Sequence, residues 1–139
     1  MKAIDELIDT ELRAKRRLYS TVPTFAIPKP KHTDSTANGL TKAILSLLAL
    51  EGHYGSRIQS QGQWQPRLGL WTKSSVRRGI GDIMAVINGK SVMIEVKIGK
   101  DRQSEWQKRT QAEVEASGGV YLVVKTFDDF MEWYKHKSI

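Results

Sequence analysis

The sequence predicts an α/β sandwich, in which helices flank a mixed β-sheet. Segments with helical periodicity alternate with segments of strand pattern, in the order helix, strands, helix, strand, helix. In the middle of the chain, an Asn88-Gly89 pair separates two apolar runs. Such a pair is the strongest short-range signal for a β-hairpin with a two-residue type I′ loop.

The composition indicates a single domain, because 40% of the 139 residues are hydrophobic, enough for a sizeable core. The chain has no cysteine, which excludes disulfides, thiolate catalysis and cysteine-based zinc sites and favours a reducing cytoplasmic location. No apolar run approaches the roughly 20 residues that span a bilayer, and the start MKAIDELIDTELRAKRR lacks a signal-peptide core. We therefore expect no membrane partner. The net charge of +7 indicates that the partner is a polyanion such as a nucleic acid.

The first predicted element is an amphipathic helix over 4–19, whose acidic residues precede its basic residues, as suits the helix macrodipole. Pro23, Pro28 and Pro30 then predict an extended linker. We assign 1–32 to this helix and linker and 33–139 to the compact domain. The helix is either an appendage or an oligomerisation arm.

The compact domain begins with a helix predicted over 38–51, which Gly52 ends. A short strand over 53–59 follows, and the hairpin strands are predicted over 80–87 and 91–98.

The remaining elements are a helix, a strand and a last helix. The first of these helices begins near Ser104 and ends at Gly118. Residues 120–124 are apolar on both sides, which predicts a strand buried on both faces. Thr126 is the expected N-cap of the last helix.

The hairpin register brings charged residues together at its open end. With a two-residue loop, Asp82 lies opposite Glu95, with Cα atoms about 4.5–5.5 Å apart, and Lys97 projects from the same face. Facing carboxylates repel each other, and a divalent cation between them reverses that effect. The pattern therefore predicts a metal site. The alternative is a surface salt bridge between Lys97 and its acidic neighbours.

The apolar pattern of the hairpin supports this register. Alternate residues of both strands form one apolar face, which consists of Ile83, Ala85, Ile87, Val92, Ile94, Val96 and Ile98. A slip by one residue would move the charged side chains into the core.

The order GIGD, IEVK, DRQSEWQ and GGVYLVV resembles the PD-(D/E)XK nuclease superfamily and, within it, the small VRR-NUC-type domains of phages and mobile elements. The resemblance covers roughly 38–129. It implies a restriction-endonuclease-like fold, a mixed β-sheet core flanked by helices. It also implies that Asp82 and Glu95 are metal ligands, that Lys97 is the catalytic lysine and that Gln107 is the glutamine of the following helix.

Two positions depart from the superfamily pattern. Gly81 stands where the superfamily name has proline, and either residue can open a strand. Many relatives place a glutamate on the first helix as an extra metal ligand, whereas the matching stretch ANGLTKAIL has Asn38. Asn38 is either a ligand through its carbonyl oxygen or the N-cap, and the cap is favoured. A second metal ion is therefore less well supported than the first.

The glutamine assignment also has alternatives. Ser104 and Gln107 match a capping box, in which the glutamine side chain bonds the helix N-terminus. Gln103 is the other glutamine that fits the superfamily position, and Gln111 would continue the same helix face.

The expected cofactor is Mg²⁺, with Mn²⁺ as a substitute. Mg²⁺ keeps several waters and needs only one or two carboxylates from a protein, so Asp82, Glu95 and the Val96 carbonyl suffice. Lys97 would either orient or deprotonate the attacking water or stabilise charge on the phosphate.

The stretch 52–81 contains no acidic residue and is expected to contact DNA. Trp64, set among glutamines, is expected to be exposed, whereas Trp71, beside two leucines, is expected to pack in the core. Cations for phosphates and aromatic rings for bases alternate here: Arg57, Arg67, Lys73, Arg77 and Arg78, with Tyr54, Trp64 and Trp71.

These features together predict a metal-dependent DNA endonuclease, with branched or replicating phage or mobile-element DNA as a candidate substrate. The alternative is a catalytically inactive nucleic-acid-binding module of the same fold, which the missing helix carboxylate favours. We also expect a homodimer, because C₂ symmetry supplies paired centres for two strands. In it, residues before Thr33 would reach a neighbouring subunit or the DNA.

Overall fold

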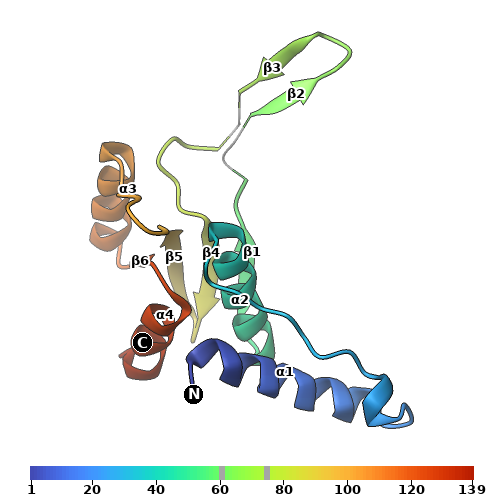
Figure 1. Ribbon diagram of the computed structural model, residues 1–139. Coiled ribbons are helices and arrows are strands. Elements are labelled where there is room, and N and C mark those ends of the chain that lie inside the picture. Colours follow the sequence, from blue (N-terminus) through green and yellow to red (C-terminus); the bar gives the residue numbers. More distant parts are fainter. Residues whose placement is uncertain (60–61, 74–75) are drawn as a thin grey trace.

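The computed structural model describes residues 1–59, 62–73 and 76–139 (Figure 1). Its helices are α1 (Ala3–Leu18), α2 (Ala37–Leu50), α3 (Glu105–Ala116) and α4 (Phe127–His136), with a short 3₁₀ turn at Thr24–Ala26. Its strands are β1 (Tyr54–Arg57), β2 (Gln63–Gln65), β3 (Leu70–Thr72), β4 (Ile83–Ile87), β5 (Lys90–Val96) and β6 (Val120–Val124). No helix in these ranges is long and apolar enough to cross a lipid bilayer.

A four-stranded mixed sheet forms the centre of the protein, which confirms the predicted fold class. Its strand order is β1-β4-β5-β6, and β6 runs parallel to β5 while the other pairs are antiparallel. The buried side chains of α1, α2 and α4 form one core with one face of β4 and β5. Helix α3 packs on the opposite face (Figure 1).

The central hairpin has the predicted register. Ile83 pairs with Ile94, and the loop residues Asn88 and Gly89 have φ angles of 52° and 78°. Both positive φ angles are the requirement of a type I′ turn. Six of the seven side chains predicted for the core face are buried, and the seventh, Ile98, lies beyond the end of β5 and is partly buried against the core.

Two details of the predicted elements are wrong. Strand β6 is the edge of the sheet, so one of its side chains, Val123, remains 41% exposed and the strand is not buried on both faces. Asn38 is not the N-cap of α2, because the cap is Thr36, whose hydroxyl accepts from the Gly39 amide at 3.0 Å. The hydroxyl of threonine, two residues earlier, accepts the helix N–H in the way that the amide oxygen of asparagine would have done.

A second, two-stranded sheet of β2 and β3 projects away from the main sheet (Figure 1), and the sequence analysis missed it. The Gln65 carbonyl accepts from the amides of Leu68 and Gly69 at 3.1 and 2.9 Å. Pro66 favours the turn that follows Gln65, and Gly69 takes a φ of 63°, which glycine adopts without strain.

Helix α1 has a buried end and an exposed end. Ala3 and Leu7 belong to the core, and the Ala3 amide donates to Asp128 of α4 at 3.1 Å. At the other end of the helix, Leu18 is 73% exposed, and Phe25 in the 3₁₀ turn that follows is 92% exposed. The domain boundary at Thr33 and the homodimer stay predictions.

Leu7→Ala is expected to lower the free energy of unfolding by about 2 to 5 kcal/mol, because it leaves a cavity where a buried leucine touched the core. Denaturant unfolding measures this loss. The matched control is Leu18→Ala, on the exposed end of the same helix, which is expected to change stability by less than about 0.5 kcal/mol. A loss in Leu7→Ala as small as that in Leu18→Ala would show that α1 does not pack on the core.

Candidate active site

The candidate site lies at the open end of the central hairpin. Asp82 immediately precedes β4, and its amide and carbonyl bond the Ile94 carbonyl and the Ile58 amide at 2.9 and 2.8 Å. Its carboxylate Oδ2 accepts from the Val96 amide at 2.7 Å. Asp82 is thereby fixed between β1 and β5, with its carboxylate held against the strand that carries Glu95.

Gly81 is adapted to this place. Its amide lies 3.3 Å from Met93 Sδ, and a Cβ there would approach Met93 Cγ to 2.7 Å. Any larger residue, proline included, would displace Met93. The glycine at this position thus matches the close packing of the strand.

Glu95 is the centre of the site. It is 2% exposed, and three side chains approach its carboxylate. Gln107 Nε2 donates to Oε1 at 2.6 Å, the Tyr121 hydroxyl donates to Oε2 at 3.0 Å, and Lys97 Nζ lies 3.4 Å from Oε1. The ion pair between Lys97 and Glu95 that the alternative interpretation predicts is therefore present, but its glutamate is buried and not on the surface.

The charges at the site are incompletely balanced. Burial first, and then the neighbouring negative charge of Asp82, raise the pKa of Glu95 from 4.5 to about 7. The hydrogen bond from Tyr121 and the charge of Lys97 act in the opposite direction and do not cancel this effect. Additional positive charge is therefore favourable beside these two carboxylates.

Gln107 caps α3, as predicted, and also contacts Glu95. Its Oε1 accepts from the Ser104 amide at 2.8 Å and completes the capping box of α3, while its Nε2 donates to Glu95. Gln103 instead donates to Gln111 at 3.0 Å and lies beside the Tyr121 hydroxyl. The helix N-terminus thus positions the amide that reaches Glu95.

Tyr121 is the residue that sequence reasoning missed. It is 5% exposed and pairs with Met93 across the parallel strands β5 and β6. Burial and the charge of Glu95 raise the pKa of its hydroxyl, so this group stays a hydrogen-bond donor. The available signal was one hydroxyl-bearing side chain in an otherwise aliphatic strand, VYLVV.

The donor set fits one hard cation. The Val96 amide points to the carboxylate of Asp82, and in a regular strand the amide and carbonyl of one residue point to the same side, so we expect the Val96 carbonyl on that side as well. A carboxylate offers about four acceptor positions, and the three neighbours of Glu95 leave room for one more bond. The described ranges hold no group of three or more acidic, histidine or cysteine residues suited to a metal, but Mg²⁺ requires only one or two carboxylates.

Asn38 does not add a further ligand in this arrangement. Its Oδ1 accepts from Arg57 Nη1 at 2.6 Å. A guanidinium therefore occupies the oxygen that would have bound a second cation.

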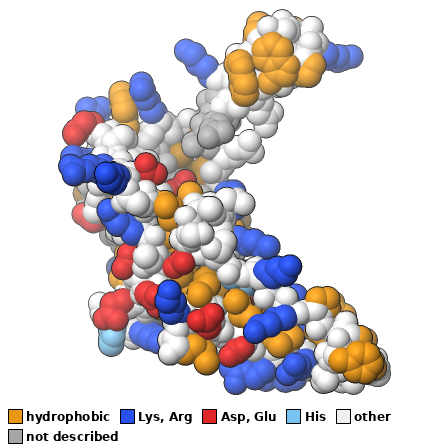
Figure 2. Space-filling view, viewed as in Figure 1, with side chains coloured by type: hydrophobic (Ala, Val, Ile, Leu, Met, Phe, Trp, Pro, Cys, Tyr) orange, Lys and Arg blue, Asp and Glu red, His pale blue; other side chains and the backbone are white. Residues whose placement is uncertain are grey.

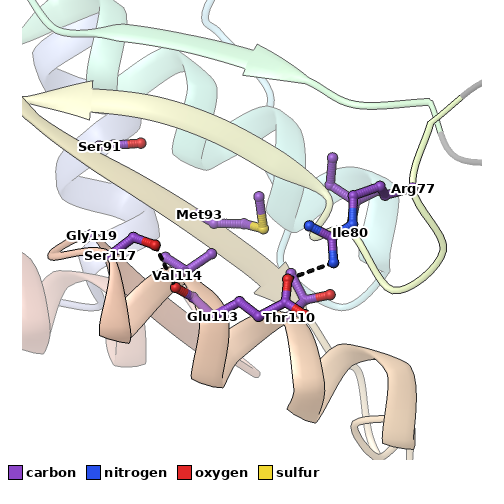
Figure 3. A pocket seen from close by; sticks show the side chains of 9 residues that line it. All are labelled: Arg77, Ile80, Ser91, Met93, Thr110, Glu113, Val114, Ser117 and Gly119. Carbon is purple, nitrogen blue, oxygen red and sulfur yellow. Dashed lines mark hydrogen bonds and ion pairs between the residues drawn. The ribbon is translucent and has the colours of Figure 1, made fainter.

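Two of the expected DNA-binding residues lie beside α3. Arg77 forms an ion pair with Glu113 at the edge of a pocket of about 320 Å³ between α3 and β5 (Figure 3). The Arg78 guanidinium lies 4.9 Å from the ring centre of Trp106. A second pocket of about 410 Å³ is lined by both arginines and by Gln107, so it adjoins the site.

Gly79 allows this segment to approach α3. It has a φ of 84°, and a Cβ there would lie 2.5 Å from the Trp106 carbonyl oxygen. The structure does not bring Arg67 and Lys73 to this place, because they belong to the β2–β3 hairpin and its exit. There, Trp64 is 50% exposed, as predicted, whereas Trp71 is 68% exposed and its predicted core packing is wrong.

The raised pKa of Glu95 predicts a pH-dependent stability in the absence of divalent metal. The folded state raises this pKa from 4.5 to about 7, so it binds the proton more tightly than the unfolded chain. The stability from this proton is complete below pH 4.5 and is lost as pH rises through about 7. Calorimetry in EDTA is expected to show this fall, and Glu95→Gln is expected to flatten it.

The control for this measurement is Glu105→Gln, which removes an exposed acid on α3 and is expected to keep the wild-type pH profile. A Glu95→Gln profile that falls as steeply as that of the wild type would contradict the assignment of the titration to Glu95.

No family model and no curated protein sequence matches the chain. A solved structure described as a VRR_NUC domain matches with a TM-score of 0.57 and 16% sequence identity, over 73% of this chain and 96% of that one. The chain therefore has the restriction-endonuclease-like fold of a VRR_NUC domain.

Proposed function

We propose that this protein is a divalent-metal-dependent DNA endonuclease with its centre at Asp82, Glu95 and Lys97. One observation carries the proposal: the buried, incompletely compensated carboxylate of Glu95, with the partly buried Asp82 and a lysine beside it. A fold shared with a VRR_NUC domain supports it, and so does the net charge of +7.

Asp82, Glu95 and the Val96 carbonyl would hold the ion, which we propose to be Mg²⁺ with Mn²⁺ as a substitute. A bound ion of this kind polarises the phosphate and lowers the pKa of water. Deprotonated Glu95 is required for binding, and the neighbouring Asp82 charge that now opposes its ionisation would then favour the ion.

The remaining side chains orient this centre. Gln107 and Tyr121 each donate to one oxygen of Glu95 and so restrict the rotation of its carboxylate. Lys97 is 16% exposed and directed at Glu95, which leaves its other N–H groups to contact a water or a phosphate oxygen. Lys97 then either orients the attacking water or stabilises the charge that develops on the phosphate.

The proposed substrate is DNA, with branched or replicating phage or mobile-element DNA as a candidate. Arg77 and Arg78 line a pocket that adjoins Gln107, where a phosphate backbone would pass the centre. The second candidate function is a catalytically inactive binding module of the same fold. The specific observation that favours it is Asn38, whose oxygen bonds Arg57 and is not offered to a metal.

Asp82→Asn and Glu95→Gln are expected to abolish cleavage, because each removes one of the two anionic metal ligands, and Lys97→Met is expected to slow it roughly 10²- to 10⁴-fold. The assay uses supercoiled plasmid and a four-way junction with Mg²⁺, Mn²⁺ or EDTA. DNA binding in EDTA should survive all three changes, since the arginines remain.

Asp101→Asn serves as the matched control, because it removes an exposed acid outside the centre and is expected to cleave as the wild type does. Cleavage at the wild-type rate by either carboxylate variant would overturn the site assignment. Binding without cleavage by the wild-type protein, on both substrates and with both metals, would establish the binding module instead.

Binding to duplex DNA is expected to weaken steeply with salt. Arg77→Ala and Arg78→Ala are each expected to lower the slope of log affinity against log salt concentration by about 0.9, one phosphate contact each. Lys90→Ala, at the opposite end of the hairpin, is the control and is expected to keep the slope. Slopes that do not change in the arginine variants would place these residues outside the interface.

A further inference from the structure

We propose that the β2–β3 hairpin is a base-stacking arm, which binds the unpaired bases of DNA through Trp64 and Trp71. The inference rests on the proposed function and extends it by naming the substrate class, which is DNA that carries unpaired bases beside a duplex. The arm would act separately from the carboxylate centre.

The two tryptophans form a cross-strand pair on one face of the arm. Trp64 and Trp71 are directly opposed in the register of β2 and β3, with ring centroids 6.1 Å apart and an angle of 60° between the rings. Directly opposed residues project from the same face of a sheet. The arm therefore presents two aromatic rings side by side.

The exposure of these two rings does not contribute to the folding of the described part of the chain. Trp64 and Trp71 are 50% and 68% exposed, and Leu68 and Leu70 beside them are 65% and 47% exposed. Figure 2 shows the apolar side chains gathered at the end of the arm. Exposed apolar patches of this kind mark interaction sites.

The charge around the arm selects a polyanion as its partner. No aspartate or glutamate occurs between Gly52 and Gly81, and Arg67 lies in the turn of the arm while Lys73 directly follows β3. Proteins that bind single-stranded nucleic acid combine such cations with aromatic side chains on which bases stack. The carboxylates of an acidic protein surface would satisfy the cations but do not provide the stacked aromatic faces that successive bases offer to the two rings.

The partner bases must be unpaired. Inside a duplex, neighbouring base pairs cover both faces of each base, so only at an end, a gap or a branch point does a tryptophan reach a base face without the cost of unstacking. Stacking is tolerant of sequence, because every base has a π-face. The arm is therefore expected to favour single-stranded and branched DNA over intact duplex, whatever the sequence.

The test compares three probes that carry phosphate backbones: a 12-nucleotide oligothymidylate, an abasic strand of the same length, and a duplex. Affinities of the full chain are measured by fluorescence anisotropy in EDTA. The wild type is expected to bind the oligothymidylate more tightly than the abasic strand. Trp71→Ala is expected to weaken only the oligothymidylate complex, roughly tenfold, from the loss of one stacked base.

Additional variants separate stacking from folding of the arm. Trp71→Leu keeps an apolar partner for Trp64 without a π-face, and the same loss is expected. Phe25→Ala removes an exposed aromatic ring outside the arm and is expected to bind all probes as the wild type does. Arg67→Ala is expected to weaken the binding of all three probes alike, because a phosphate contact does not distinguish them.

Equal affinity of the wild type for the oligothymidylate and the abasic strand would overturn the inference. An equal loss on all three probes in Trp71→Ala and Trp71→Leu would do so as well. Because these measurements exclude cleavage, their failure is distinct from that of the nuclease. A protein that cleaves with Mg²⁺ but shows no preference for bases lacks the arm function alone, and one that prefers bases without cleaving lacks the nuclease function alone.

Discussion

The burial of Glu95 beside Asp82 is the constraint on which the candidate site depends. A carboxylate removed from water costs several kcal/mol unless charges and hydrogen bonds compensate it. Here the compensation comes from three separate places in the chain: Lys97 directly follows β5, α3 supplies Gln107 and β6 supplies Tyr121. The pKa of about 7 shows that this compensation is incomplete. The fold thus keeps a local electrostatic strain of the kind found at functional sites.

Side chains alternate along β4 and β5, so the buried charge lies on one face of the sheet and the hydrophobic core on the other. One face of the two strands contributes fully buried aliphatic residues such as Ile83 and Ile94 to the core with α2 and α4. The other face carries Met93 and Glu95 towards α3. A destabilising charge is therefore tolerated on one side of the sheet, because close packing on the other side holds the backbone in place.

Local signals predicted most of this arrangement, and non-local contacts account for what they missed. The Asn88-Gly89 turn and the period of two determined the hairpin register, and the spacing of Ser104 and Gln107 predicted the capping box. Tyr121 reaches Glu95 only because β6 lies parallel to β5, which no local pattern reveals. For the same reason the exposure of Val123 on the edge strand was not predicted.

The errors at Trp71 and Asn38 have equally physical causes. The leucines beside Trp71 are typical of a core strand, but they lie on a two-stranded ribbon that no other described element covers. Asn38 and Thr36 are both good helix caps, and propensity alone does not rank two such residues that are so close in the chain.

The side chains of the candidate centre come from one uninterrupted stretch of the chain, from Asp82 to Tyr121. Helix α1 and the β2–β3 arm both precede that stretch. Changes in loop length cost little free energy when they fall outside the elements that define a site. The β2–β3 arm, unlike the core elements α2 and β1, is therefore free to change in length and in recognition surface without displacing the centre.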